Sequence, residues 1–135
     1  MVALVLVGHS AELLRGLTAM LAQLAPSVPV RAAGGTPDGN LGTSAPLIER
    51  ALWDAAAISG GDGAVVLLDL GSAFLSYEIA LENLPAQMAA RIRLSHGPLV
   101  EGAVLGALEA SGGAGLERVL EVADAAAAAP KILEP

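Results

Sequence analysis

Short apolar runs alternate along the chain with longer segments in which apolar residues recur at helical spacing. The apolar runs predict strands at Val2–Val7, Val28–Ala33, Ala64–Asp69 and Arg91–Leu94. The helical spacing predicts helices over Ala11–Ala25, about Ala45–Ile58, Gly71–Leu84 and Leu99–Ala128, the last broken at Gly112–Gly115. The alanine-rich tail, Ala125–Ala129, has high helix propensity and ends at Pro130.

Strands that alternate with helices are typical of a parallel sheet with helices on both faces and right-handed crossovers. The first strand is continuously apolar, as in strands that are covered on both sides. We therefore expect an α/β fold, a three-layer, doubly wound and mostly parallel sheet in the flavodoxin-like order 2-1-3-4. A chain of 135 residues fits a single domain over residues 1–135.

Composition excludes several classes of partner. The chain is 54% hydrophobic, but no apolar run approaches the roughly 18 residues that a membrane-spanning helix needs. The net charge is −7, and aromatic residues are only 2% of the chain, so we expect no nucleic-acid surface and no membrane contact. The absence of cysteine and of a signal-peptide pattern is consistent with a cytoplasmic protein.

Two predicted strand ends deliver a polar residue to the same edge of the sheet. His9 follows the first strand and Asp69 ends the third, and in flavodoxin-like order these strands are neighbours at the switch point where open α/β sheets bind ligands. A carboxylate that accepts a hydrogen bond from one imidazole nitrogen fixes the tautomer and leaves the other nitrogen as a nucleophile. The pair predicts a catalytic centre, although His9 alone is equally consistent with a helix cap and Asp69 alone with a turn residue.

Other residues near these strand ends have both a structural and a phosphate-binding interpretation. Ser72 opens a helix after Asp69, so it either caps that helix or reaches a phosphate on His9. The glycine-rich segment Gly34–Ser44 allows its backbone to approach a phosphate closely. The predicted phosphate-binding residues are Ser10, Gly35, Thr36, Gly42, Thr43 and Ser72. No P-loop lysine motif and no dinucleotide-binding glycine motif occurs.

The second histidine, His96, lies in a loop beside Gly97 and Pro98, and we interpret it as incidental to the site. Glu101 is expected to cap or orient the following helix rather than to act in catalysis. A metal site formed by His9, His96 and Asp69 is conceivable, but nothing in their spacing indicates one. We therefore predict no bound metal.

Four segments together resemble the phosphotransferase subunit family of phosphoenolpyruvate-dependent dihydroxyacetone kinases, whose domain is similar to mannose-class sugar phosphotransferase IIA domains. They are VGHS, AAGGTPDGNLGTS, VVLLDLGSAFLSYEIALE and LSHGPLVEGAVLGALEAS, and they span nearly the whole chain. In that family the histidine matching His9 carries a phosphoryl group and the aspartate matching Asp69 holds its ring. His96 stands where the family more often has another residue, which supports keeping it out of the site.

The resemblance implies a relay with no resident cofactor. In this relay the phosphocarrier protein HPr passes a phosphoryl group to His9, which accepts it on Nε2. His9 then passes the group to ADP held on the nucleotide-binding subunit of the kinase. It also implies a homodimer, and because the chain shows no HPr-like segment, we expect HPr to be a separate protein.

Two other functions remain open at this point. One is the IIA domain of a mannose-class sugar transporter, against which the Gly34–Thr43 loop and the lack of a linker to a IIB domain argue. The other is a flavodoxin-like binding or regulatory module in which His9 is structural. Uptake of a phosphoryl group by His9 would distinguish the kinase subunit and the sugar-transport IIA domain, which are both carriers, from the binding module.

Overall fold

The computed structural model describes residues 1–133 and contains a parallel sheet of four strands in the order β2-β1-β3-β4. The strands are β1 (Ala3–Gly8), β2 (Val30–Gly34), β3 (Ala64–Leu68) and β4 (Ile92–Leu94). β1 pairs with β2 on one side and with β3 on the other, with Val7 opposite both Ala33 and Leu68. The predicted α/β class and strand order are confirmed.

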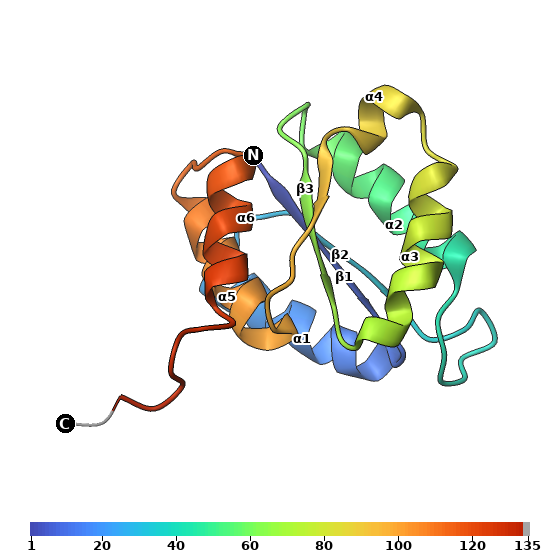
Figure 1. Cartoon of the computed structure of the whole chain (residues 1–135), viewed down its shortest axis with the longest axis horizontal. Coiled ribbons are helices and arrows are strands. Elements are labelled where there is room, and N and C mark those ends of the chain that lie inside the picture. The colour runs from blue at the N-terminus through green and yellow to red at the C-terminus, as the bar shows by residue number, and fades with distance from the viewer. Residues whose placement is uncertain (134–135) are drawn as a thin grey trace.

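Helices cover both faces of this sheet (Figure 1). The helices are α1 (Ala11–Leu24), α2 (Ala45–Ile58), the 3₁₀ turn η1 (Gly71–Ala73), α3 (Phe74–Glu82), α4 (Ala86–Ala89), α5 (Leu99–Ser111) and α6 (Leu116–Ala125). In Figure 1, α1, α5 and α6 lie on one side of the strands, and α2 and α3 lie on the other. This arrangement gives the predicted three layers.

Each face of the sheet has its own aliphatic core. Leu4 and Leu6 of β1 pack into the core under α1, α5 and α6, whereas Val5 and Val7 pack into the core under α2 and α3. All of β1 is buried, which explains why its sequence is continuously apolar rather than alternating. The lone tyrosine, Tyr77 of α3, is buried in the second core, and this burial raises the pKa of its phenol to about 12.

The helices begin where the sequence supplies caps. The Ser10 hydroxyl accepts a hydrogen bond from the Leu13 N–H, and the Ser44 hydroxyl accepts one from the Leu47 N–H. Pro46 lies in the first turn of α2, where its missing N–H is not needed. The predicted bounds of α2 are the observed ones.

Some elements differ from the sequence prediction, beginning with β2, which starts at Val30 instead of Val28 and ends at Gly34 instead of Ala33. The segment predicted as one helix over Gly71–Leu84 divides into η1 and α3, and the four-residue α4 follows Pro85. The alanine-rich tail leaves helical geometry after Ala125, and its last N–H groups bond three residues back instead of four.

Across residues 1–133, no helix is both long and apolar enough to cross a membrane.

Candidate functional site

His9 lies immediately beyond the carboxyl end of β1, and Asp69 lies beyond the carboxyl end of the neighbouring β3. The sheet ladder continues one residue past β3, because the Asp69 N–H donates to the Val7 carbonyl at 3.0 Å. This pairing fixes the Asp69 backbone beside the strand that carries His9. Parallel pairing therefore places both side chains at one edge of the sheet, the position predicted for the site.

The Asp69 carboxylate holds both the ring and the backbone of His9. The Nδ1 atom of His9 lies 3.0 Å from Oδ1 and 3.1 Å from Oδ2 of Asp69, and the His9 N–H donates to Oδ2 at 2.9 Å. The Asp69 side chain is 10% exposed and that of His9 is 27% exposed. The carboxylate is thus mostly enclosed, while the ring reaches solvent.

The carboxylate is itself held in place. The Leu70 N–H donates to Asp69 Oδ1 at 2.7 Å, so both carboxylate oxygens accept a backbone hydrogen bond. Gly8 provides the space for this arrangement, because a Cβ at that position would lie 2.7 Å from Asp69 Oδ2. Sequence reasoning assigned Gly8 no part in the site, although a glycine that ends an apolar strand is a signal of close approach by another group.

The opposite nitrogen of the ring faces a hydroxyl. His9 Nε2 lies 3.1 Å from Ser72 Oγ, which η1 presents at its second residue. Because Asp69 is an acceptor at Nδ1, the favoured neutral tautomer carries its proton on Nδ1 and leaves the Nε2 lone pair facing Ser72. Asp69, His9 and Ser72 are therefore aligned so that the carboxylate holds Nδ1 of the ring and Nε2 faces the Ser72 hydroxyl.

Two helical N-termini flank the imidazole. α1 begins at Ala11, two residues after His9, and η1 begins at Gly71, next to Ser72. The first N–H groups of a helix have no acceptor within the helix, and the positive end of the dipole favours an anion. The Ser10 hydroxyl is occupied as the cap of α1, so Ser10 contributes a side chain to the helix start rather than to His9.

The glycine-rich loop is attached to the backbone on either side of His9. The Gly35 N–H donates to the Gly8 carbonyl at 3.2 Å, and the Gly42 N–H donates to the His9 carbonyl at 3.0 Å. Gly35 and Gly42 have φ of 77° and 138°, a region that favours glycine. These two residues position the backbone of His9, and their binding of phosphate stays a prediction.

The two threonines of this loop bond elsewhere. Thr36 Oγ1 bonds Asp38 and accepts the Asn40 N–H, and the hydrogen bond from Thr36 holds the pKa of the Asp38 carboxyl below its usual value. Thr43 Oγ1 lies 2.7 Å from Ser76 Oγ of α3, a partner that no pattern in the sequence indicated. Neither threonine hydroxyl is hydrogen-bonded to His9, and their contact with phosphate also stays a prediction.

His96 has no hydrogen bond to this centre. Its N–H donates to Asp124 Oδ1 at 2.8 Å, and its exposed ring lines a cavity of about 700 Å³ that extends from β4 to Asp69. Within residues 1–133, no three potential ligands among histidine, cysteine, aspartate and glutamate lie together as a metal site would require. The structure groups His9, Asp69 and Ser72 and keeps His96 apart.

The chain is similar in sequence to one protein family and to several known proteins. The family model described as EIIA-man, PTS system fructose IIA component, matches residues 3–120. A DhaM from Escherichia coli, named phosphoryl donor subunit of a PEP-dependent dihydroxyacetone kinase, is 35% identical over 89% of this chain and 26% of its own length. A DhaM from Listeria innocua, named for dihydroxyacetone kinase 2, is 34% identical over 90% of this chain and 95% of its own length.

The chain therefore spans about a quarter of the E. coli relative and nearly all of the L. innocua relative. Among solved structures, the unknown function protein EF1359 is similar, with a TM-score of 0.78 and 31% identity over 92% of this chain and 94% of that one. A DegV family protein from Corynebacterium glutamicum has a TM-score of 0.61 at 18% identity over 91% of this chain and 47% of that one. That second likeness shows the fold alone.

Proposed function

The chain belongs to the EIIA-man family, described as the PTS system fructose IIA component, and from this membership we propose that it is the phosphoryl carrier of a PEP-dependent dihydroxyacetone kinase. The curated relatives named DhaM support the kinase, since their names describe its phosphoryl donor subunit. The observation that carries the proposal is the geometry of His9, with Nδ1 held by Asp69 and Nε2 facing the open side of the site.

In the first step, Nε2 of His9 attacks the phosphorus of phosphorylated HPr. The phosphorus–nitrogen bond to the HPr histidine breaks, its electron pair stays on that ring, and a new bond forms to Nε2. The His9 ring becomes positively charged while Nδ1 keeps its proton, and the Asp69 carboxylate 3.0 Å away stabilises that charge. Ser72 and the N–H groups that begin α1 and η1 donate to the phosphoryl oxygens.

In the second step, the phosphoryl group leaves His9 for the terminal phosphate oxygen of ADP on the nucleotide-binding subunit. The Nε2–phosphorus bond breaks, its electron pair returns to the ring, and the new phosphorus–oxygen bond makes ATP. Phosphoryl transfer of this kind depends mainly on positioning and charge stabilisation. An exposed imidazole on a fixed carboxylate suits two protein partners that approach in turn.

The test follows the label from phosphoenolpyruvate. The chain is incubated with labelled phosphoenolpyruvate, enzyme I and HPr, and acid-labile phosphate is measured on the wild type and on His9→Ala. His96→Ala is the matched control, because these are the only two histidines. We expect label on the wild type and on H96A and none on H9A. Undiminished label on H9A would overturn the assignment.

A second measurement separates the kinase from sugar transport. The labelled protein is mixed with the nucleotide-binding and dihydroxyacetone-binding subunits, ADP and dihydroxyacetone. We expect label to appear in dihydroxyacetone phosphate. Transfer instead to a sugar-transport IIB domain, with none to ADP, would favour the transporter, to which the family description, PTS system fructose IIA component, also points.

We also propose that the chain is a homodimer, as its resemblance implies. Large apolar side chains are exposed on α1 and α5, among them Leu13, Met20, Leu24, Leu105 and Leu108. Such surface is typical of contact with another protein. Light scattering on the purified chain is expected to give twice the monomer mass, and a monomer at micromolar concentration would contradict the proposal.

A further inference from the structure

The outer edge of β2 lies at the bottom of a groove between two helices. β2 is the end strand of the sheet, and α1 and α2 pack against opposite faces beside it. The groove has a volume of about 390 Å³, and its floor is formed by Arg31–Gly34. One wall is α1, with Arg15 and Thr18, and the other is α2, with Arg50 and Asp54.

The floor of this groove presents backbone groups that the sheet does not use. Pairing with β1 takes the Pro29 carbonyl at one end, where Leu4 donates to it, and the Gly35 N–H at the other end, which donates to Gly8. Parallel pairing alternates along a strand, so the N–H and C=O groups of Val30, Ala32 and Gly34 point away from β1. The Val30 carbonyl accepts a hydrogen bond from the Arg31 side chain at 3.0 Å, and all of these groups point toward the position that a further strand would take.

Three arginines surround the groove without carboxylate partners. Among the residues that the structure describes, Arg15, Arg31 and Arg50 form no ion pair, and Arg31 donates only to the neighbouring Val30 carbonyl. The one carboxylate in the groove lining is Asp54, so the three arginines leave the described lining with a net positive charge.

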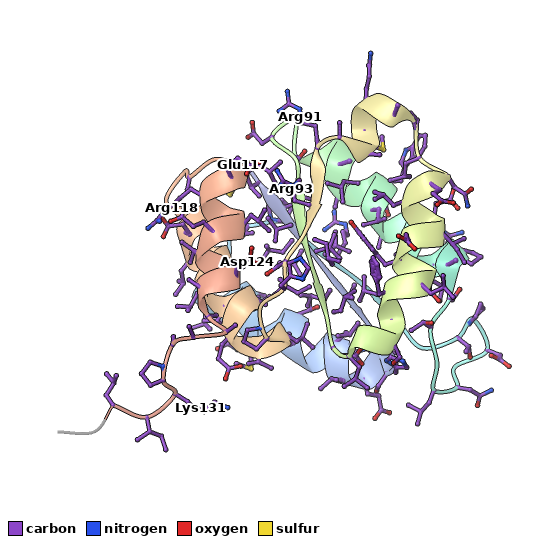
Figure 2. All side chains as sticks on the ribbon, in the orientation of Figure 1. Arg91, Arg93, Glu117, Arg118, Asp124 and Lys131 are labelled. Atoms are coloured by element: carbon purple, nitrogen blue, oxygen red, sulfur yellow. The ribbon has the colours of Figure 1, made fainter. Side chains whose placement is uncertain are left out.

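The other cationic side chains are occupied, and Figure 2 shows them around β4, α6 and the C-terminal tail. Arg93 pairs with Glu117, Arg118 with Glu109 and Glu121, Lys131 with Glu101, and Arg91 donates to the Gly61 carbonyl. Four arginines thus form no ion pair among the described residues, and three of the four lie at the β2 edge of a chain whose net charge is −7.

This charge decides which occupant the groove fits. A second copy that paired its own β2 edge across a two-fold axis would bring both sets of arginines together, which like-charge repulsion disfavours. An acidic segment would meet them favourably. Thr18 also lines the α1 wall, and its buried hydroxyl has no hydrogen-bond partner within residues 1–133.

We propose that the β2 edge groove is a docking site for an extended, acidic segment of a partner protein, which adds to the sheet as a strand beside β2. Successive side chains of an added strand point to opposite faces. Adjacent acidic residues of the segment would thus meet Arg15 on the α1 wall and Arg50 on the α2 wall. Main-chain hydrogen bonds supply affinity, and the arginines select for carboxylates.

The groove adjoins the histidine centre without being part of it. Ala11 and Gly34 line its end at the carboxyl edge of the sheet, beside Ser10 and Gly35. A Cβ on Gly34 would lie 2.6 Å from the Ser10 carbonyl oxygen, so the groove end and the start of α1 are in direct contact. A segment docked here would hold its protein next to His9, and the inference stands whether or not His9 carries phosphate.

The experiment uses the whole chain, labelled with nitrogen-15, and a capped peptide of sequence EEVEEV as probe. Amide shifts are followed through a titration at low and at physiological salt. We expect the largest changes at Val30, Ala32 and Gly34, with weaker binding at higher salt. The glutamine peptide QQVQQV is expected to cause no change at these amides.

Two triple variants with equal net charge locate the effect. Arg15→Gln, Arg31→Gln and Arg50→Gln remove the groove cations, and Arg91→Gln, Arg93→Gln and Arg118→Gln remove three cations elsewhere. We expect the first set to weaken peptide binding by about tenfold or more and the second to leave it nearly unchanged. Both variants are first checked for the wild-type amide spectrum outside the substituted residues.

Three results would overturn the proposal. The first is a wild type whose amides at the β2 edge do not respond to the peptide. The second is equal loss of binding in the two triple variants, which would mean that net charge alone attracts the probe. The third is a response of the arginine side chains to inorganic phosphate that exceeds their response to the peptide, which would make the groove a small-anion site.

Discussion

The two histidines follow strands at the same edge of the sheet, and each lies beside an aspartate from a different element. At His9 the carboxylate of Asp69 bonds the ring as well as the backbone N–H. At His96 the carboxylate of Asp124 bonds the backbone N–H and the Ser95 hydroxyl, at 2.8 and 2.6 Å. The first aspartate fixes an imidazole, and the second fixes a loop.

The two histidines share a position at the sheet edge and differ in whether a carboxylate holds the ring. An imidazole with one nitrogen held by a carboxylate has a defined tautomer and a nearby negative charge that stabilises its cation. An exposed imidazole without such a contact has neither. The predictions below test this contrast by changing corresponding residues at the two histidines.

The largest effect is expected from the two aspartates. Asp69→Asn keeps the size of the side chain but removes its charge, so phosphoryl transfer to His9 is expected to slow about a hundredfold or more. Asp124→Asn is expected to leave the transfer rate unchanged and to lower the free energy of unfolding by about 1–2 kcal/mol. Rapid-quench labelling and urea unfolding measure the two quantities.

Equal transfer rates for D69N and the wild type would show that Asp69 acts only as a turn residue. A slow D124N with unchanged stability would contradict the purely structural role of Asp124. Either result would remove the distinction drawn between the two histidines.

Substitution of the glycines beside the two histidines is expected to affect the labelling rate at Gly8 and the free energy of unfolding at Gly97. A Cβ at Gly8 would lie 2.7 Å from Asp69 Oδ2, so Gly8→Ala displaces the carboxylate and slows labelling about tenfold. A Cβ at Gly97 would lie 2.0 Å from the Ala123 carbonyl oxygen, so Gly97→Ala strains the backbone and costs about 1–3 kcal/mol of stability.

Labelling rates at a temperature where both glycine variants are folded, together with thermal unfolding, test this pair. G97A is expected to label at the wild-type rate while it unfolds at lower temperature. A G8A variant that labels normally would show that the carboxylate tolerates the added methyl group.

A smaller effect is expected at Ser72. Its hydroxyl lies 3.1 Å from His9 Nε2, and a single neutral hydrogen bond contributes about 1 kcal/mol, which corresponds to about fivefold in rate. Ser72→Ala should therefore slow labelling by about that factor. Ser76→Ala, which removes the partner of Thr43 instead, is the control and should leave the rate within twofold, about 0.4 kcal/mol.

The last prediction needs no substitution and concerns the tautomer of each histidine ring in the wild type. Long-range nitrogen–proton NMR spectra distinguish the two neutral tautomers of each ring. We expect His9 to be almost entirely the Nδ1–H form because Asp69 accepts that proton, and His96 to show exchange between forms. A His9 ring with its proton on Nε2 would contradict the assignment of the nucleophilic atom.

Much of the fold follows from local patterns that the sequence displays. α2 was predicted with its observed bounds, because Ser44 and Pro46 mark its start and the break at Ser59–Gly61 marks its end. The alternation of strands and helices predicted the parallel sheet, and the order 2-1-3-4 was expected by analogy with flavodoxin-like folds. α4 was missed because four residues after Pro85 carry too little pattern, and the end of α6 was missed because alanine favours a helix without fixing its geometry.

Only the residues of the site that directly follow predicted strands could be placed from the sequence. His9 and Asp69 each follow an apolar run, so the topology alone brings them together. The partners of the loop were not predictable, because the Gly42 N–H bonds the His9 carbonyl and Thr43 bonds Ser76 across long stretches of chain. The unpaired arginines of the β2 edge also required the structure, since Arg15, Arg31 and Arg50 lie on three separate elements.

The buried tyrosine gives the chain a built-in indicator of unfolding at high pH. The pKa of Tyr77 rises from 10.0 to about 12 because burial disfavours the phenolate, so the unfolded chain loses this proton first. The contribution of Tyr77 to stability is therefore fully present below pH 10 and is lost as the pH rises toward 12, by about 2–3 kcal/mol. Since Tyr77 is the only tyrosine, most of the ultraviolet absorbance of phenolate at pH 11 comes from unfolded chains.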